Sequence, residues 1–176
     1  MIYGAEGLES RAQAWDLLAL AAAEYWGLSP LPETARAPGG KPYFPGKPEL
    51  RFNLSHSGAL ALCALDSRPV GVDIQVVKQW RPTLPRRVCT REELDWLGGQ
   101  PRFWPAFTRL WALKEARAKA GGRGLTRPVR EIRVPLPGAG AARLDGLWFG
   151  CYQGPGWAAA VCGQSPPPEG ILWRGL

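Results

Sequence analysis

Four residues spaced four apart near the middle of the chain could carry chemistry together. Phe107, Trp111, Glu115 and Lys119 share one face of a helix, because residues four apart lie one turn above another. The row begins with two aromatic side chains and ends with a carboxylate and an ammonium. A carboxylate that extends an aromatic row is expected to be partly buried, and a buried charge needs a partner or a metal ion. The alternative is a surface pair between Glu115 and Lys119, worth roughly a few tenths of a kcal/mol.

A second group of polar residues lies in the segment Gly71-Val-Asp-Ile-Gln75. Side chains alternate between the two faces of a strand, so Asp73 and Gln75 share a face that Val72 and Ile74 do not. Two oxygen-bearing side chains on one face could hold a hard cation such as magnesium. An exposed strand face that happens to carry two polar residues is the alternative.

Two polar loops could bind phosphate. The segment with Asn53, Ser55 and His56 is predicted to place polar side chains and free backbone N–H groups at a strand end, which suits an anion. An ordinary hairpin turn is the alternative for this segment. In the preceding loop, Lys41 is followed by Pro42 and preceded by glycine, so a phosphate contact and a solvated lysine are both open.

Several other chemistries lack their sequence signals. The single histidine, His56, has only Ser55 and Ser57 as serine neighbours, and these are poorly placed to be its nucleophile, so a Ser-His-Asp triad would need residues from elsewhere. No Walker A sequence occurs, and no G-x-G-x-x-G follows a strand. The four cysteines form no C-x-x-C pair, so no zinc or redox motif is predicted and a reducing cytoplasm is the expected setting.

The formal net charge of +7 favours acidic partners, which include nucleic acid, anionic lipid, a polyphosphate ligand and an acidic protein. Nine tryptophans would fit base stacking, but no nucleic-acid-binding motif and no run of five basic residues occurs. The apolar run at 17–23 is too short to span a bilayer and is flanked by Asp16 and Glu24. We therefore expect neither nucleic acid nor a membrane as partner.

Local patterns predict helices and strands in alternating groups. The first group begins with a strand at Ile2-Tyr3 and a helix that runs from a capping box at Ser10 to Trp26 and ends at Gly27. A long loop over 28–48 follows. Strands are then predicted at 50–54, 59–65 and 70–74, and a hairpin turn at 66–69 joins the last two. The second group is a short helix from a Thr90 capping box to Leu97, a longer helix over 105–120, strands at 131–134, 144–153 and 157–162, and a short tail after Pro168. This order predicts a single α+β domain with two similar halves, about 1–77 and 78–176.

Five short segments occur together in the order and at spacings similar to those of one enzyme family. They are Gly40-Lys-Pro42, Phe52-Asn-Leu-Ser-His-Ser57, Gly71-Val-Asp-Ile74, Leu110-Trp-Ala-Leu-Lys-Glu115 with Lys119, and Gly122-Arg-Gly-Leu125. In this combination the chain resembles the Sfp-type 4′-phosphopantetheinyl transferases, the class typified by the enzyme that activates surfactin synthetase. Each segment is modest alone, but the ordered set is specific and covers about residues 10–163.

The resemblance implies a 4′-phosphopantetheinyl transferase fold, in which two α/β halves are related by a pseudo-twofold axis and coenzyme A lies between them. It implies transfer of the 4′-phosphopantetheine arm of coenzyme A to a serine of an acyl or peptidyl carrier protein, with Mg2+ as cofactor and release of 3′,5′-ADP. Acidic carriers would suit the charge of +7. Because one chain carries both halves, a monomer is expected.

The resemblance also assigns roles position by position. The metal would be held by Asp73, Gln75 and Glu115, and Glu115, Lys119 and Asp73 would carry catalysis. Coenzyme A would be bound by Arg11, Lys41, Pro42, Asn53, Ser55, His56, Asp73 and Lys119. Gln75 stands where many family members have a metal-binding glutamate. Because the chain is shorter than typical members near its first helix, Arg11, Lys41 and Arg36 are expected to replace the family's basic contacts to the 3′-phosphate.

A relative that holds a carrier domain without catalysis is the remaining alternative. The presence of all three of Asp73, Glu115 and Lys119 argues against it.

Overall fold

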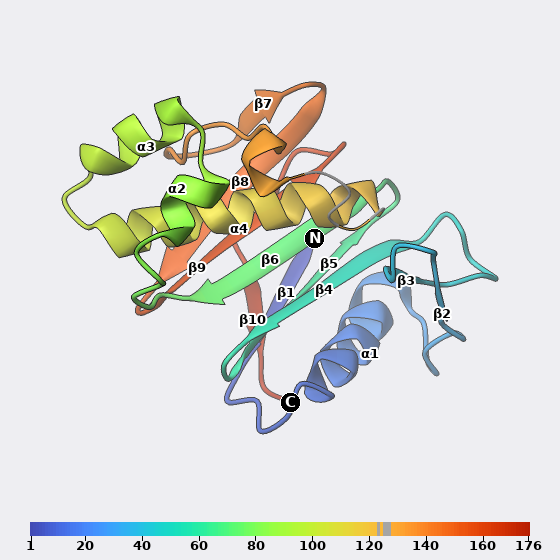
Figure 1. Cartoon of the computed structure of the whole chain (residues 1–176). Coiled ribbons are helices and arrows are strands. Elements are labelled where there is room, and N and C mark those ends of the chain that lie inside the picture. Colours follow the sequence, from blue (N-terminus) through green and yellow to red (C-terminus); the bar gives the residue numbers. More distant parts are fainter. Residues whose placement is uncertain (123, 125–127) are drawn as a thin grey trace.

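The computed structural model describes residues 1–122, 124 and 128–176. These residues form two four-stranded sheets, a two-stranded ribbon, four α-helices and one short 3-10 helix (Figure 1). The fold is therefore mixed α+β, as the order of sequence patterns predicts. No helix in the described part of the chain is long and apolar enough to cross a membrane.

The first sheet brings both ends of the chain together. Its elements are β1 (Ile2–Glu6), β4 (Arg51–Ser57), β5 (Leu60–Asp66) and β10 (Leu172–Arg174), covered by α1 (Gln13–Trp26). The strand order is β10-β1-β5-β4, and β1 runs parallel to β10 and antiparallel to β5. The apolar face of α1, which includes Leu17, Leu18 and Ala21, packs in one core cluster with Phe44 and Phe52. The ribbon of β2 (Ala35–Arg36) and β3 (Pro42–Tyr43) lies in the loop after α1.

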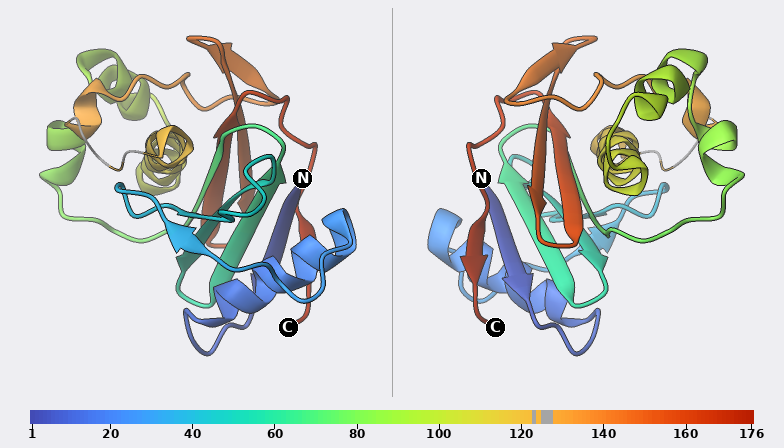
Figure 2. Two further views of the ribbon diagram at one scale, coloured as in Figure 1. Left: turned by 90° about the vertical axis from the view of Figure 1, so that its right-hand side faces the viewer. Right: turned by 90° about the vertical axis from the view of Figure 1, so that its left-hand side faces the viewer.

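The second sheet carries the long helix. Its strands are β6 (Val70–Val76), β7 (Ala142–Leu144), β8 (Leu147–Gly154) and β9 (Trp157–Gly163), in the order β6-β9-β8-β7, and α4 (Phe103–Gly121) packs on β6 and β9. The buried face of α4 presents small side chains such as Ala112 and Ala116. Small residues let helix and sheet approach closely. Figure 2 shows the strands of both sheets from two sides, with α1 and α4 beside different sheets.

A hydrophobic cluster outside the two sheets packs around the first half of α4. It contains α2 (Leu84–Val88), α3 (Arg91–Gly98) and the 3-10 helix η1 (Val129–Glu131). The rings of Trp80, Phe107 and Trp111 pack against one another within it, in edge-on and tilted arrangements with centroid distances of 5.8–6.3 Å. The Lys114 ammonium is buried beside this cluster and lies 2.8 Å from a carboxylate oxygen of Glu93. The ion pair therefore ties α3 to α4.

The helix predictions are confirmed with small shifts. Gly27 ends α1 in the left-handed conformation at φ 66°, and the Thr90–Glu93 capping box is present at the start of α3. The first helix begins at Gln13 and not at Ser10, because only half of its capping box forms: the Gln13 side chain accepts the Ser10 N–H at 3.0 Å, while no side chain caps the helix. The C-cap of α4 is Gly122, one residue beyond the predicted stop.

Three strand predictions are wrong for identifiable reasons. β5 and β6 do not form a hairpin, because β5 already pairs with β1 on one side and β4 on the other, so the turn at 66–69 crosses between sheets. The predicted strand at 131–134 is η1 and irregular chain, and the Ile132 carbonyl accepts a hydrogen bond from Lys114 at 3.0 Å. The predicted strand at 144–153 is interrupted by a tight turn at Asp145 and Gly146, which both have positive φ.

The long loop and the tail also contain structure that the sequence patterns missed. β2 and β3 pair within residues 28–48, and β10 follows the Pro166–Pro168 segment to join β1. The predicted polar loop around Asn53, Ser55 and His56 is instead part of β4 and pairs with β5. One edge of this segment is thus paired with β5, and its other edge faces β6.

Candidate active site

Edge strands of the two sheets meet along a seam made by side chains. Backbone N–H groups of β6 donate to side-chain oxygens of β4: Val72 to Asn53 at 2.8 Å, Ile74 to Ser55 at 3.2 Å, and Val76 to Ser57 at 3.0 Å. The acceptors lie two residues apart on β4, so they project from one face of that strand. The seam joins two unpaired sheet edges and brings the polar segment of β4 against Asp73.

Gly71 sets the distance between β6 and α4. A Cβ atom at this position would overlap the backbone carbonyl of Ala116 and the backbone nitrogen of Ala120. Because both obstacles are helix backbone, no side-chain rotation could relieve the overlap. The absence of a side chain at Gly71 therefore lets the last turns of α4, which carry Glu115 and Lys119, lie directly on β6.

Lys119, Asp73, Ser55 and Gln75 form one hydrogen-bonded network. The Lys119 ammonium lies 2.6 Å from Asp73 Oδ1 and donates to the Ser55 hydroxyl at 2.9 Å and to the Val72 carbonyl at 3.2 Å. Ser55 donates to the same Asp73 oxygen at 2.8 Å, and the Gln75 amide donates to Asp73 Oδ2 at 2.8 Å. Asp73 is 2% exposed, so its charge depends on these donors.

Glu115 faces the same space without joining this network. Burial raises the pKa of its carboxyl, and the nearby Asp73 carboxylate raises it further, while the Lys119 ammonium acts in the opposite direction. An additional positive charge in the hollow would therefore stabilise the charged form of Glu115. The sequence-based alternative of a Glu115–Lys119 surface pair is not what the structure contains, since Lys119 pairs with Asp73.

These groups line a hollow of about 350 Å³, which we call the Asp73 hollow. Its wall is formed by Arg11, Ala14, Trp15, Arg36, Pro42, Leu54, Ser55, His56, Asp73, Gln75, Glu115 and Lys119. The side chains of Arg11, Arg36 and His56 are exposed at its rim. The hollow thus has a buried acidic floor, an ammonium beside it and a cationic rim.

A second hollow of about 250 Å³ adjoins the first, and we call it the Gly40 hollow. Pro42, Leu54, Glu115 and Lys119 line both spaces, and Gly40 lines only the second. Asn53 also lines the Gly40 hollow, although its side-chain oxygen is already engaged in the seam. The two spaces together form a groove along the junction of the sheets.

Lys41 anchors the loop that forms one wall of this groove. Its ammonium donates to the Val70 carbonyl at 2.6 Å and to the Lys119 carbonyl at 2.9 Å. Burial, reinforced by Arg51, lowers the pKa of Lys41 to about 8. Lys41 borders the Gly40 hollow and is not among the residues that line the Asp73 hollow. It therefore lies apart from Arg11 and His56, the other predicted phosphate ligands.

The donor set suits a hard divalent cation. Among the described residues no three His, Cys, Asp or Glu side chains come together as a metal-binding group, so the set is the Asp73 and Glu115 carboxylates and the Gln75 amide. Carboxylate and amide oxygens are ligands that magnesium takes, usually with waters and substrate phosphates completing the shell. A cation between the two carboxylates would also offset the repulsion from Asp73, which adds to burial in raising the pKa of Glu115.

The structure brings most of the predicted site residues together. Asp73, Gln75, Glu115, Lys119, Ser55, His56, Arg11 and Pro42 line one hollow, whereas Asn53 and Lys41 lie at the adjoining one. Sequence reasoning missed the wall residues Trp15 and Leu54. It also missed the central place of Ser55, for which the alternation of Asn53, Ser55 and Ser57 was the available signal. The Gly122–Leu125 segment of the resemblance lies partly outside the described residues, at 123 and 125.

Comparison with known proteins shows similarity to one superfamily. Residues 69–162, more than half of the chain, match the profile of the 4′-phosphopantetheinyl transferase superfamily. The 4′-phosphopantetheinyl transferase Sfp of Bacillus subtilis strain 168 is 34% identical over 142 residues, which cover 75% of this chain and 63% of that protein. The 4′-phosphopantetheinyl transferase AcpT of Salmonella typhi is 38% identical over 147 residues, which cover 79% of this chain and 71% of that protein.

A further 4′-phosphopantetheinyl transferase of Bacillus subtilis is 33% identical over 132 residues, which cover 73% of this chain and 59% of that protein. The chain thus spans about three fifths of the length of these Bacillus relatives. The chain has an α+β fold in which α4 places Glu115 and Lys119 against Asp73 of β6. This arrangement is consistent with membership of the same superfamily. On the matched profile and these identities, the chain belongs to the 4′-phosphopantetheinyl transferase superfamily.

Proposed function

We propose that this protein transfers the 4′-phosphopantetheine arm of coenzyme A to a serine of an apo acyl or peptidyl carrier protein, and that it requires Mg2+ and releases 3′,5′-ADP. The observation that carries the proposal is the meeting of Asp73, Lys119 and Glu115 in one hollow, with Lys119 at 2.6 Å from Asp73. Membership of the superfamily supports the same reaction class.

The Asp73 and Glu115 carboxylates would hold the metal ion, with the Gln75 amide oxygen as a weaker ligand after rotation of that side chain. A bound magnesium supplies positive charge that neutralises a pyrophosphate and fixes its orientation. Of the two carboxylates, Asp73 is held by three donors and Glu115 by none among the contacts in the described residues. Glu115 is therefore the one free to move toward an incoming group.

Lys119 would stabilise the negative charge that develops on the transferred phosphoryl group. Its ammonium is fixed by Asp73, Ser55 and the Val72 carbonyl, so it needs little reorganisation during the reaction. An ammonium held in place in this way favours a charge-rich transition state over a less charged ground state.

Glu115 is our candidate base for the carrier serine. Its carboxylate lines the Asp73 hollow and accepts no hydrogen bond from the described residues, so an oxygen that is not bound to the metal ion is available to accept a proton. The serine proton passes to Glu115 directly or through a water. The serine oxygen then bonds to the β-phosphorus of coenzyme A, and the bond from that phosphorus to the bridging oxygen breaks, so 3′,5′-ADP leaves with the electron pair.

The remaining predicted ligands would position coenzyme A along the groove. Arg11 and His56, at the rim of the Asp73 hollow, are suited to phosphate groups, with Arg36 as a further cation. Ser55 lies close enough to contribute its hydroxyl, although that group already serves the network. Lys41, Pro42 and Asn53 would contact the adenosine end from the Gly40 hollow.

The acidic surface of carrier proteins is the expected counterpart of this chain. A net charge of +7 should draw an acidic domain toward the groove and make association weaken as salt concentration rises. We propose a cytoplasmic setting, in keeping with four cysteines that are all unpaired thiols.

We also propose that residues 1–176 act as a single domain and as a monomer, with halves 1–77 and 78–176 related by pseudo-twofold symmetry. Each sheet takes one strand from the other half of the chain: β6 precedes the boundary and pairs with β9, and β10 follows it and pairs with β1. This exchange favours one cooperative unit.

The direct test is incubation of the protein with coenzyme A, Mg2+ and an apo-carrier, followed by intact-mass measurement of the carrier. We expect the carrier to gain the phosphopantetheine arm, and we expect Asp73→Asn to prevent the gain while leaving the melting temperature close to that of the wild type. An unmodified carrier after prolonged incubation with the folded wild-type protein would overturn the proposal.

A further inference from the structure

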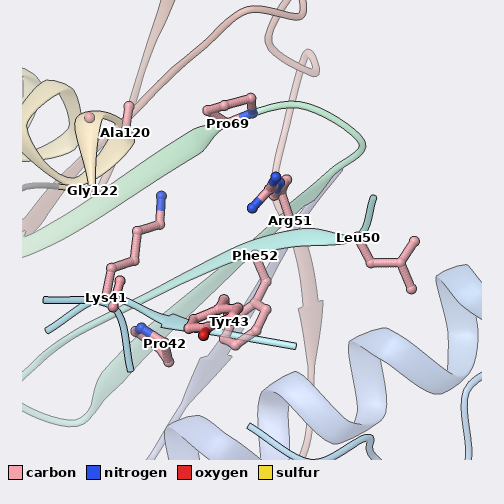
Figure 3. Close-up of a pocket in the computed structure, with 11 residues that line it drawn as sticks. Lys41, Pro42, Tyr43, Leu50, Arg51, Phe52, Pro69, Ala120 and Gly122 are labelled. Carbon is pink, nitrogen blue, oxygen red and sulfur yellow. The ribbon is translucent and has the colours of Figure 1, made fainter. Parts of the chain in front are cut away.

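Lys41 also borders a third hollow that contains none of Asp73, Gln75 and Glu115. This space has a volume of about 350 Å³, and we call it the Arg51 hollow (Figure 3). It lies where β3 and the start of β4 face Pro69 and the C-terminal end of α4. Pro69, which precedes the first residue of β6, lines this hollow, whereas Gln75 lies near the last residue of that strand. The hollow is therefore separate from the acidic floor of the Asp73 hollow.

Two cations meet in this space without an acidic partner. Figure 3 shows that the side chains of Lys41 and Arg51 direct their charged ends into the hollow. None of its described lining residues is acidic, and within the described chain the Arg51 guanidinium has no ion pair or side-chain hydrogen bond. Asp66 is the cross-strand neighbour of Arg51, yet its side chain bonds to Ser165 and the Arg68 backbone instead.

The rest of the wall is apolar. Phe52, which is 2% exposed, Tyr43 and Leu50 form one side, and Pro42 and Pro69 close the ends. An apolar wall favours a ligand with a hydrocarbon body, while two unneutralised cations favour an anionic head. The volume lies at the small end of the range of about 300–1,000 Å³ that is typical of ligand pockets, so the ligand is small.

We propose that the Arg51 hollow is a second ligand site, separate from the groove for coenzyme A, that takes a small carboxylate carried on an apolar stem. The planar guanidinium of Arg51 matches a carboxylate with two parallel N–H···O contacts. The Lys41 ammonium, two of whose N–H groups bond to the Val70 and Lys119 carbonyls, adds positive charge beside this contact.

Calorimetric titration of the whole protein with octanoate tests this proposal. We expect saturable binding of octanoate that persists with coenzyme A present in excess. Octanol, which lacks the head, and acetate, which lacks the stem, should each bind about tenfold more weakly or not at all. Loss of octanoate binding when coenzyme A is added would show that the hollow belongs to the coenzyme groove, and would overturn the proposal of a separate site.

Two variants locate the binding. Arg51→Gln should weaken octanoate binding about tenfold or more, because it removes the charge-assisted contacts while keeping a chain of similar length. Arg68→Gln is the matched control, since Arg68 is an exposed cation in the turn before Pro69 and does not line the hollow. Equal octanoate affinity in the wild type and Arg51→Gln, with both proteins folded by melting temperature, would contradict the assignment. The titration is independent of whether transfer to a carrier occurs.

Discussion

The Lys119 ammonium lies 2.6 Å from Asp73 Oδ1, although Glu115 precedes it by one turn on the same helix. Ser55, from β4, donates to the same oxygen and accepts from the same ammonium. One residue from each of α4, β6 and β4 therefore meets at a single point on the seam between the sheets. The catalytic groups proposed here depend on that seam for their positions.

Ser55→Ala should reduce transfer much more than it reduces stability. The change removes the hydroxyl that orients both Asp73 and Lys119, so we expect the transfer rate to fall about tenfold or more, with a loss of roughly 1–2 kcal/mol in the free energy of unfolding. Single-turnover transfer and denaturant unfolding measure the two effects separately.

Ser57→Ala provides the matched control. It removes a seam acceptor for the Val76 N–H at 3.0 Å but no contact to Asp73 or Lys119. Its stability should fall by about 1 kcal/mol or less and its rate should stay near that of the wild type. Equal rates in the two serine variants would mean that Ser55 has no positioning role.

Gly71→Ala should destabilise the whole fold. The added methyl would overlap the backbone of α4 at Ala116 and Ala120, and the strain can be relieved only by moving the helix away from β6. We expect a loss of roughly 2–3 kcal/mol in unfolding free energy. Gly46→Ala is the control, because a Cβ there has no atom within 4 Å, and it should change stability by less than about 0.5 kcal/mol. Similar melting temperatures for both variants would contradict the close packing.

The sequence predicted on which elements the site residues lie better than it predicted the contacts between them. The four-residue spacing of Glu115 and Lys119 and the alternation of Asp73 with Gln75 are local, so they placed these side chains correctly on a helix face and a strand face. The pairing of Lys119 with Asp73 spans 46 residues, and no local pattern contains it.

Helix ends and strand pairing show the same difference between local signals, which the sequence contains, and long-range partners, which it does not reveal. Gly27 and the Thr90 capping box are local signals, and both predictions are confirmed. The hairpin predicted at 66–69 was wrong because the turn residues do not reveal that β5 already has two partners. β10 was missed because the partners of its three residues, β1 and the Glu24 carboxylate of α1, lie at the other end of the chain. The split at Asp145 could have been predicted from the Asp-Gly pair.

The stability contribution of Lys41 should increase with pH. Its pKa is lowered from 10.5 to about 8 in the folded protein, so between these values the unfolded chain binds more protons and raising the pH favours folding. Three neighbouring groups also affect this pKa: the charges of Arg51 and Lys119 lower it, and the charge of Cys162 raises it. Relative to Lys41→Met, the wild type should gain about 2 kcal/mol of unfolding free energy between pH 7 and 9.5.

The comparison with Lys41→Met is needed because buried thiols act in the opposite direction. Burial raises the pKa of Cys151 to about 11 and of Cys162 to about 12, so the folded state holds their protons longer and loses stability at alkaline pH. The effect of Cys151 is common to both proteins and cancels in the difference, whereas the Lys41 charge also lowers the pKa of Cys162, so the two proteins are compared in a Cys162→Ala background. A difference that stays constant from pH 7 to 9.5 would show that Lys41 is charged throughout.

Gln75→Glu should tighten the dependence of transfer on magnesium. The variant replaces an amide that donates to Asp73 Oδ2 with a third carboxylate beside Asp73 and Glu115. A hard cation gains affinity from added negative charge. Without the metal, the same charge should be repulsive, so the melting temperature should fall in chelator and recover in Mg2+. Magnesium titrations of rate and melting temperature that match the wild type would place Gln75 away from the ion.

Single-turnover transfer by Glu115→Gln and Lys119→Ala, measured together with coenzyme A affinity, tests the central claim most directly. We expect both variants to stay folded and their rates to fall by orders of magnitude at saturating coenzyme A. Lys119→Ala should lose far more rate than affinity. Arg91→Ala supplies the reference, since Arg91 forms an exposed helix pair with Asp95 and should leave the rate unchanged. Wild-type rates in both site variants, with shifts in melting temperature no larger than that of Arg91→Ala, would contradict the account.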